Sequence, residues 1–388
     1  MEPLQKGILA LVCAGITGEP MPLPTEFSME EAFRQIQRHQ IPGLAFEGAL
    51  RCGVPKTHPV MQQLFRIYCM DVQYSQRQTD AVRTLCEAFE EQGIDYMCMK
   101  GCNLKPLYPK HELRRMGDAD ILIRDEQYPM IKKIITKLGY REDVGADHTY
   151  TWKSDALYLE LHKRPIPKES ADLYAYFGDG WSRTRLCEGH RYEQMAEDEY
   201  IYVFVHYAKH YRLGGIGLRQ VIDLWVYRRA HPHMDEAYIE AELDKLQLRE
   251  FYRNTVRTLK VWFEEGAADE TTELLGQFIF DSGSWGTYTS TVLSKGVKYR
   301  SGRGRARQRN TLRLIFPTAL EMEGRYRVLV RHRWLLPVCW VIRWFDILLH
   351  RRKNIKRRMQ EKDILNEEDL SVYERNMRTV GLAYHFDD

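Results

Sequence analysis

Residues 93–123 of the chain read GIDYMCMKGCNLKPLYPKHELRRMGDADILI, and this stretch decides the fold. IDYMCM, residues 94–99, is short, apolar and bounded by Gly93 and Gly101, so it predicts a strand. NLKPLY predicts a short helical turn. DADILI, residues 118–123, begins with alternating polar and apolar residues and contains β-branched residues, which predicts a second strand. A strand, a turn and a strand in so short a stretch indicate the start of an α/β core.

The core continues for about 40 residues beyond this stretch. Residues 126–138 have the pattern of a helix, which stops at the C-cap position Gly139. HTYTWK (148–153) and ALYLELH (156–162) then predict two more strands.

Both flanks of this core have helical patterns. S-M-E-E, beginning at Ser28, is a capping-box pattern, and apolar spacing predicts a long helix from about Val60 to Glu91. We therefore expect an α+β, or mixed α/β, chain in which a small mixed sheet is flanked by N-terminal and C-terminal helical regions. The expected parts are an N-terminal helical region (1–92), the α/β core (93–198), a helical domain (199–280), a basic loop (281–310) and a C-terminal helical region (311–388).

The composition indicates a folded protein and no particular partner. Hydrophobic residues make up 44% of the 388 residues, charged residues 29%, and the formal net charge is +3. The eight cysteines form no C-x-x-C pair, which fits free thiols in a reducing compartment. The first residues predict a helix in preference to a signal peptide, and no apolar run reaches the ~20 residues of a membrane span. We therefore expect a cytoplasmic protein.

Two aspartates lie two positions apart on the second predicted strand. Because side chains alternate along a strand, Asp118 and Asp120 project from the same face, opposite Ala119. Carboxylates so close repel each other unless a cation joins them, and magnesium is a cation that carboxylates share with substrate phosphates. The alternative is an acidic strand end that faces solvent.

A third carboxylate lies on the last predicted strand. Leu157, Leu159 and Leu161 share one face of ALYLELH, while Tyr158, Glu160 and His162 share the other. A carboxylate in so apolar a strand must be solvated, paired or bound to metal. Glu160 would complete a two-metal site of the kind that clamps the oxygens in a phosphoryl displacement. The alternative is a solvent-facing polar stripe.

Two basic positions point to phosphate binding. Lys100 and Gly101 precede a helical turn, where backbone N–H groups can approach an anion. Arg114 could bind phosphate oxygens bidentately, and so could Arg115. A plain strand-to-helix turn and two surface charges are the alternatives.

The order of these motifs resembles a known family. K-G-x-x-L, then L-R-x-M-G-D-x-D-I-L-I, then a helix ending in L-G-Y, then L-E-L-H, all within Met99 to His162, resemble the uncharacterised bacterial nucleotidyltransferases of the polymerase-β-like superfamily. The chain also looks like the toxin-type nucleotidyltransferases of abortive-infection systems.

The resemblance implies a small mixed sheet with helices on one side. It also implies an enzyme that uses a nucleoside triphosphate, which we expect to be ATP, together with Mg2+. It implies that Asp118, Asp120 and Glu160 are the catalytic and metal-binding carboxylates. It implies that Lys100, Gly101 and Cys102 form the phosphate turn, with Arg114 beside it. The superfamily's usual turn has a second small residue and a hydroxyl residue where this chain has Cys102 and Asn103.

A second group of polar residues follows the core. His206 and His210 are four apart on one helical face, and Asp223 follows on the next helix, one turn after Arg219. They could line the acceptor side of the cleft, with a histidine or Asp223 assisting deprotonation of a hydroxyl. The alternatives are a zinc site and a structural polar network.

Two C-terminal segments carry unusual composition. Residues 294–310 hold many Lys and Arg and no acid, which fits either a solvated loop or a contact with nucleic acid or acidic lipids. Residues 334–349 are strongly apolar and are followed by HRRKNIKRR. We expect a buried helix there, with an interfacial helix as the alternative.

Three functions compete. The leading one is a magnesium-dependent nucleotidyltransferase whose acceptor is a hydroxyl or phosphate on a small molecule, a protein or RNA. The altered K-G-C-N turn motivates a second, a degenerate relative that binds a nucleotide or partner without catalysis. The basic segment motivates a third, a toxin-like enzyme acting on tRNA.

Overall fold

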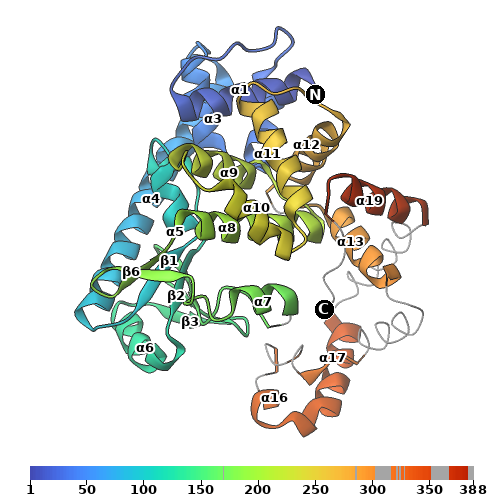
Figure 1. The fold of residues 1–388 in the computed structure, drawn as a ribbon. Helices are drawn as coiled ribbons and strands as arrows, with labels where there is room; N and C mark the ends of the chain where they lie inside the picture. The colour runs from blue at the N-terminus through green and yellow to red at the C-terminus, as the bar shows by residue number, and fades with distance from the viewer. Residues whose placement is uncertain are drawn as a thin grey trace.

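The computed structural model describes residues 1–168, 170–284, 286–301, 316–319, 322, 325–326, 328–350 and 367–382 of the chain. Within them, helical regions precede and follow a mixed β-sheet (Figure 1). The predicted fold class is therefore confirmed. No helix among these described residues is long and apolar enough to cross a membrane.

The N-terminal region is helical, as predicted. Ser28 caps its second helix, since the Ser28 hydroxyl accepts a hydrogen bond from the Glu31 N–H at 3.3 Å. The first and third helices cross so closely that a Cβ atom on Gly48 would overlap the Leu11 carbonyl oxygen. The helices are α1 (Pro3–Thr17), α2 (Met29–Arg38), α3 (Pro42–Arg51) and α4 (Pro59–Glu91).

The described residues form a sheet of seven strands in the order β3-β4-β5-β2-β1-β7-β6. Four of them match the predicted strands, and three were not predicted. The unpredicted strands β3, β6 and β7 are short, largely polar and lie toward the two edges of the sheet, so they lack the apolar pattern that marks a strand in a sequence. The strands are β1 (Tyr96–Met99), β2 (Ala119–Ile123), β3 (Arg141–Asp143), β4 (Thr149–Lys153), β5 (Tyr158–His162), β6 (Thr184–Glu188) and β7 (Arg191–Gln194).

Short helices connect the central strands. Between β1 and β2 lie α5 (Gly101–Leu104), η1 (Lys105–Leu107) and η2 (His111–Leu113). After β2 come η3 (Asp125–Gln127) and α6 (Tyr128–Lys137), the helix that the sequence predicts over 126–138.

The two faces of the sheet differ chemically. One face packs against α4 and α6 through a buried apolar cluster that includes Leu85, Phe89, Ile121, Ile131, Ile135, Leu159 and Leu161. The other face carries Asp120 on β2 and Glu160 on β5, which are register partners in a parallel pair. Helices from the second half of the chain cover part of this face, so the sheet has helices on both sides and not on one side alone.

The second half of the chain supplies those helices. Their largest buried side chains include Phe204, Trp225 and Phe251, which share one core with the N-terminal helices. The helices are α7 (Ala171–Phe177), α8 (Ala196–Gly214), α9 (Leu218–Ala230), α10 (Glu236–Lys245), α11 (Arg249–Phe263), α12 (Glu270–Ser282), α13 (Tyr288–Ser301), α16 (Val328–Arg331), η4 (Arg333–Leu335), α17 (Leu336–His350) and α19 (Glu367–Thr379).

The prediction of a basic loop over residues 281–310 is wrong for residues 288–301, which are helical. They form α13, because Val292 and Val297 are buried against neighbouring helices and the Ser294 hydroxyl donates to the Arg212 carbonyl at 2.6 Å. Tertiary packing thus overrides a polar local sequence. Residues 302–310 lie outside the described residues, as do the basic run 351–358 and the terminal residues 383–388.

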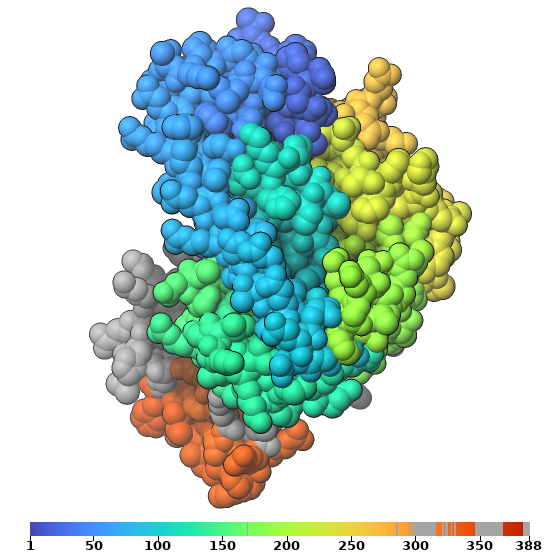
Figure 2. Space-filling view, turned by 90° about the vertical axis from the view of Figure 1, so that its left-hand side faces the viewer, coloured from blue at the N-terminus to red at the C-terminus, as the bar shows by residue number. Residues whose placement is uncertain are grey.

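The segment 334–349 is helical, but the prediction that it is a buried helix is wrong for its outer side. Trp334 is 75% exposed and Phe345 is 60% exposed. Among the described residues, a small cluster with Leu329 and Cys339 at its centre covers the inner side. The helix therefore lies apart from the main core (Figure 2).

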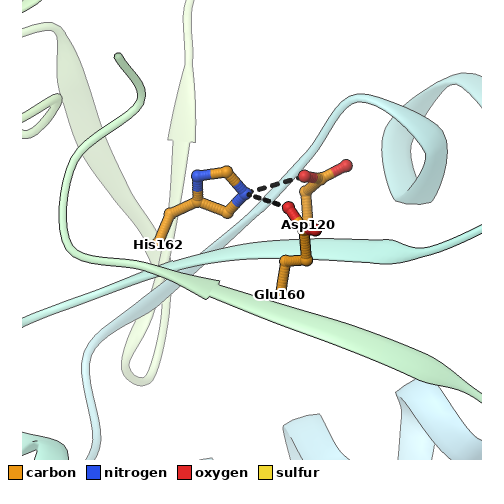
Figure 3. Close-up of side chains that lie close together, drawn as sticks. All are labelled: Asp120, Glu160 and His162. Carbon is orange, nitrogen blue, oxygen red and sulfur yellow. Dashed lines mark hydrogen bonds and ion pairs between the residues drawn. The ribbon is translucent and has the colours of Figure 1, made fainter. Parts of the chain in front are cut away.

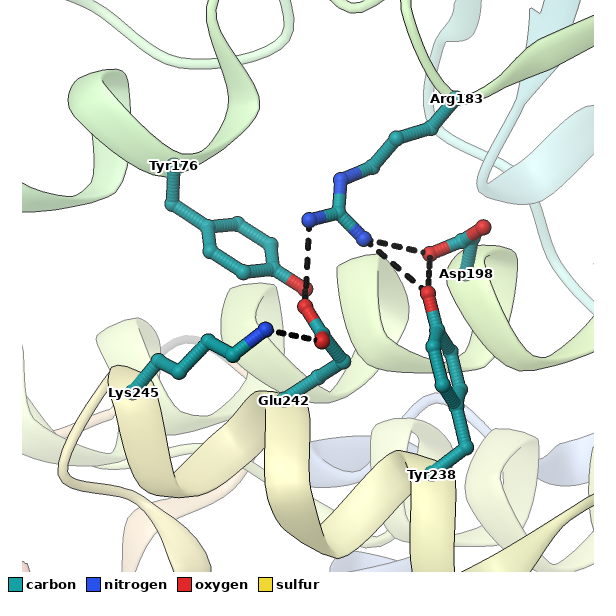
Figure 4. A network of polar contacts seen from close by, with 6 residues as sticks. All are labelled: Tyr176, Arg183, Asp198, Tyr238, Glu242 and Lys245. Atoms are coloured by element: carbon teal, nitrogen blue, oxygen red, sulfur yellow. Dashed lines mark hydrogen bonds and ion pairs between the residues drawn. The ribbon is translucent and has the colours of Figure 1, made fainter.

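A polar network joins the sheet to the helical domain (Figure 4). Arg183, just before β6, donates to Asp198 on α8 at 2.8 Å and to Glu242 on α10 at 3.1 Å. The Tyr176 hydroxyl donates to Glu242 at 2.7 Å, and Lys245 forms an ion pair with the same carboxylate. One guanidinium thus connects three separate elements.

We expect Arg183→Met to lower the free energy of unfolding by roughly 1 to 3 kcal/mol, because Asp198 and the buried Glu242 each lose a charged donor. Arg185→Met is the matched control, since Arg185 pairs with Glu193 on the exposed β6–β7 hairpin and such pairs contribute about 0.5 kcal/mol. Urea unfolding followed by tryptophan fluorescence measures both. Equal losses in the two variants would show that the network does not join the two parts.

Candidate active site

Three carboxylates predicted to act together lie on one wall of a pocket. Asp120 is on β2 and Glu160 on β5, at paired positions of a parallel register, and Asp118 immediately precedes β2. All three line the pocket. The register explains the convergence, because paired residues on neighbouring strands project from the same face.

His162 completes this group, and the sequence analysis did not assign it a role. Its Nε2 atom lies 2.7 Å from Asp120 Oδ1 and 3.5 Å from Glu160 Oε2 (Figure 3). The signal in the sequence was its position two residues after Glu160, on the same face of the strand. Burial lowers the pKa of His162, but the hydrogen bonds that its ring donates to Asp120 and Glu160 raise it by more, so that the net shift is upward.

Lys100 also contacts Asp120. Its Nζ atom is 2.7 Å from Asp120 Oδ1, the same oxygen that His162 contacts. Burial by itself would raise the pKa of Asp120, yet the Lys100 charge and the His162 hydrogen bond outweigh burial and hold that pKa well below its usual range. Burial by itself would lower the pKa of Lys100, but the negative charge of Asp120 raises it by more, so the net shift is upward. Asp120 is therefore ionised although it is only 2% exposed.

Asp118 behaves differently from Asp120. Burial raises the pKa of Asp118, and the charge of Asp120, with a smaller contribution from Glu160, raises it further, while Lys100 opposes the shift. Burial is the largest cause of this upward shift, and repulsion from the neighbouring carboxylates adds to it. A cation placed among them would relieve the repulsion.

The turn after β1 holds Lys100 in an unusual backbone conformation. Lys100 has φ +46°, a region that residues with side chains rarely adopt. Strain of this kind is found at functional sites. Gly101 follows at the start of α5, where a Cβ atom would crowd Met116 and Arg114.

Cys102 and Asn103, the two departures from the superfamily's turn, direct their side chains away from the pocket. Cys102 packs at the edge of the apolar cluster below the sheet. The Asn103 side chain donates to the Cys98 carbonyl at 2.8 Å and to Glu199 on α8 at 2.6 Å. Neither side chain is part of the pocket lining. The departures therefore alter the support of the turn and leave the wall of the pocket unchanged.

Arg114 lines the pocket but has a partner in Asp223. Its Nε and Nη2 atoms donate to the two Asp223 oxygens at 2.7 and 2.9 Å, and the Tyr108 hydroxyl donates to the same carboxylate at 2.7 Å. Arg114 and Asp223 are both buried. Asp223 thus belongs to a polar network that joins α9 to the α5–β2 connection. A structural polar network was the alternative to a role for Asp223 on the acceptor side of the cleft. Phosphate binding by Arg114 stays a prediction, and only Nη1, near Gly101, faces the turn.

His206 and His210 form the pocket wall that α8 supplies. Their Nε2 atoms lie 3.2 Å apart. Burial lowers the pKa of His210 to about 4, with help from Lys209 and Lys100, and it lowers the pKa of His206 even further. Both rings are therefore neutral near pH 7, and one donates a hydrogen bond to the other. Among the described residues, no third metal-ligating side chain joins this pair, which removes support for a zinc site.

The pocket between these walls has a volume of about 290 Å3. Gly215 and Ser284 lie on its far side, where the chain segments are so close that the Thr287 N–H donates to the Gly214 carbonyl at 3.0 Å. Ser284 and Gln220 line this side, and among the described atoms Ser284 Oγ and Gln220 Oε1 are buried without a hydrogen-bond partner. The sequence analysis missed both residues because a lone serine or glutamine has no distinguishing pattern.

The donor set suits a divalent cation held by oxygen. Among the described residues, one group of three His, Cys, Asp or Glu side chains is compact enough to hold a metal ion, namely Asp120, Glu160 and His162, whose ligand atoms lie within 4.8 Å of one another. The His162 Nε2 atom is directed at Asp120 Oδ1, and among the described atoms its Nδ1 atom is buried without a hydrogen-bond partner. The contact of His162 with Oδ1 orients Asp120. Asp118, Asp120 and Glu160 bring carboxylate oxygens, the kind of ligand that magnesium prefers, to one wall of the pocket.

Comparison with known proteins agrees with this geometry. A family model described as "Uncharacterised nucleotidyltransferase" matches residues 25–264 of the chain. The matched span begins before α2 and ends after α11, so it contains both walls of the pocket except Ser284. No curated protein and no solved structure matches the chain.

We expect Arg114→Met to lower the free energy of unfolding by about 3 to 5 kcal/mol, because it leaves Asp223 buried and without its ion-pair partner. Arg115→Met is the control, since Arg115 pairs with Asp71 in a more exposed position and the expected loss is about 1 kcal/mol. The double variant Arg114→Met, Asp223→Leu removes the uncompensated charge and recovers most of the loss. Chemical unfolding of all four proteins tests this. If Arg114→Met unfolds like the wild type, Arg114 has no structural role and its guanidinium is reserved for ligand.

Proposed function

The chain belongs to the family of uncharacterised nucleotidyltransferases, and on that premise we propose that it moves a nucleoside monophosphate from a nucleoside triphosphate, with magnesium, onto an acceptor hydroxyl or phosphate. One observation carries the proposal. Asp118, Asp120 and Glu160 converge on one pocket wall, and the Lys100 ammonium occupies the side of Asp120 that faces the phosphate turn.

The three carboxylates would hold the metal. Magnesium, when bound, supplies positive charge that neutralises the phosphate oxygens and the attacking oxygen during an in-line displacement. His162 Nε2 holds the Asp120 carboxylate in one orientation, and the second Asp120 oxygen points away from His162 (Figure 3). Asp120 therefore presents a fixed, ionised oxygen to the pocket.

Lys100 and Glu160 have complementary roles in the transfer that we propose. Lys100, with the backbone N–H groups at the start of α5, binds the phosphates that become pyrophosphate. Glu160 is half-buried and reaches the pocket, so it can take the proton of an acceptor hydroxyl. The acceptor oxygen then bonds to the α-phosphorus, and pyrophosphate leaves. The neutral His206 and His210 line the acceptor's side, where they can donate or accept a hydrogen bond.

The nucleoside has a candidate position of its own. Ser284 and Gln220 offer uncharged polar atoms that are buried without a partner, a situation that costs about 1 to 3 kcal/mol for each atom and that a ligand can relieve. Uncharged donors and acceptors suit a base edge or ribose hydroxyls better than phosphate. We propose that these two side chains bind the nucleoside, and we expect ATP as the donor.

Two observations bear on the alternatives and on location. The K-G-C-N turn motivated a protein that binds a nucleotide without catalysis, but the side chains of Cys102 and Asn103 lie outside the pocket, which favours an active enzyme. The described residues add nothing specific in favour of a tRNA acceptor. All eight cysteines are free thiols, which supports a cytoplasmic location.

We expect Asp120→Asn to weaken magnesium-dependent ATP binding by roughly tenfold or more and to abolish nucleotide transfer, because it removes one charged ligand. Asp155→Asn, in the exposed turn between β4 and β5, is the control and should bind like the wild type. Calorimetry with ATP and magnesium measures binding, and pyrophosphate release over small-molecule, protein and tRNA acceptors measures transfer. Unchanged binding in Asp120→Asn would refute the metal site. Tight binding without pyrophosphate release over any acceptor would identify a nucleotide-binding protein that does not catalyse transfer.

The nucleoside position has a separate test. We expect Ser284→Ala and Gln220→Leu each to weaken ATP binding by about tenfold, because each removes a buried hydrogen bond, and to leave tripolyphosphate binding unchanged. Gln277→Leu, at an exposed position of α12, is the control. If both variants bind ATP normally but transfer more slowly, these side chains bind the acceptor and not the nucleoside.

A further inference from the structure

The C-terminal lobe, defined here as α16, η4 and α17, has a closed inner side. Leu329 and Cys339 are buried in its small apolar cluster, and the Trp340 indole N–H donates to the Pro317 carbonyl at 2.7 Å. Phe316 packs edge-on against Trp340 and Trp344. The lobe therefore has its own packing and lies at the lower edge of the molecule (Figure 2).

The outer side of the lobe is apolar and open. Five large hydrophobic side chains there are between 45% and 75% exposed. Their spacing of four, three, one and three residues places them along one face of a helix. We call this face the apolar stripe: Trp334, Val338, Val341, Ile342 and Phe345. Soluble surfaces rarely leave so many large apolar side chains together, which marks the stripe as a contact surface.

The charge around the stripe identifies the kind of contact. Residues 325–358 contain eleven Lys and Arg and a single acid, Asp346. Arg331 and Arg333 are exposed beside the stripe, and six of the eleven lie in the sequence directly after α17. The rest of the chain carries a net charge of −7, since the whole protein has a net charge of only +3. Residues 325–358 are therefore one of two strongly basic segments of the chain, the other being residues 294–310.

A basic helix with an exposed apolar face suits an anionic lipid surface. The acyl chains near the headgroups accept apolar side chains, and the headgroup phosphates attract Lys and Arg. Trp334 is suited to the boundary between these layers because its ring is apolar and its N–H is polar. α17, at 15 residues, is too short to span a bilayer but long enough to lie along its surface.

We propose that α17 lies in the headgroup region of an anionic bilayer, with the apolar stripe inserted and the exposed Arg331 and Arg333 beside it toward the lipid phosphates. This inference is independent of the proposed transfer reaction, because none of its residues lines the pocket. It assigns the lobe a role in positioning the protein at a membrane surface.

The test is co-sedimentation of the full chain with vesicles of phosphatidylcholine, with or without phosphatidylglycerol. The wild type should bind the anionic vesicles, bind pure phosphatidylcholine at least tenfold more weakly, and dissociate as salt rises. The variant Ile342→Glu, Phe345→Glu should bind at least a hundredfold more weakly, because it removes two inserted side chains and adds negative charge. Its melting temperature should match the wild type, since both side chains are exposed.

Met70→Glu on α4 is the control, because Met70 is 60% exposed but lies far from the lobe in the sequence and belongs to another helix. It should bind vesicles like the wild type. Equal binding to both kinds of vesicle, or wild-type binding by the Ile342→Glu, Phe345→Glu variant, would overturn the proposal. A wild type that ignores vesicles but forms a dimer that the variant abolishes would also overturn it, and would show that the stripe pairs with a second copy of the chain.

Discussion

The structure depends on the compensation of one buried carboxylate. Asp120 lies in the middle of the sheet, nearly inaccessible to water, and an unpaired charge there would be strongly destabilising. Lys100 and His162 contact the same Asp120 oxygen. This arrangement requires β1 to end next to β2 and β5 to run parallel to β2, so the placement of three strands is coupled to one charge.

The helical domain is attached to the sheet through a shared apolar core, which includes Met97, Met99 and Leu122 of the sheet, and through polar contacts. Arg114 binds Asp223 on α9, Asn103 binds Glu199 on α8, and Arg183 joins α8 to α10. Polar contacts of this kind are directional, so they define the spacing of the two walls as well as holding them together. The pocket keeps its shape because its margins are fixed, while its interior retains polar atoms without partners.

The pocket and the C-terminal lobe use charge in opposite ways. In the pocket, each cation is placed against a specific carboxylate, and pKa shifts follow from these pairs. In residues 325–358, eleven basic residues accompany a single acid, so the segment carries a net positive charge. Charges paired one to one build a precise site, whereas an excess of one sign beside exposed apolar side chains gives a surface that can attract a partner of opposite sign.

The sequence by itself determined the parts that have a local pattern. Alternation in DADILI and ALYLELH predicted β2 and β5 and the shared face of Asp118 and Asp120, and helical spacing predicted α4 and α6. Only the tertiary structure decided which strands are neighbours, and therefore that His162 meets Asp120 and that Arg114 is paired with Asp223. It also decided that 288–301 is a helix and that the outer side of α17 is exposed. The reason is physical: periodicity records which face of an element is apolar, whereas pairing between charges and the covering of a face depend on elements far apart in the chain.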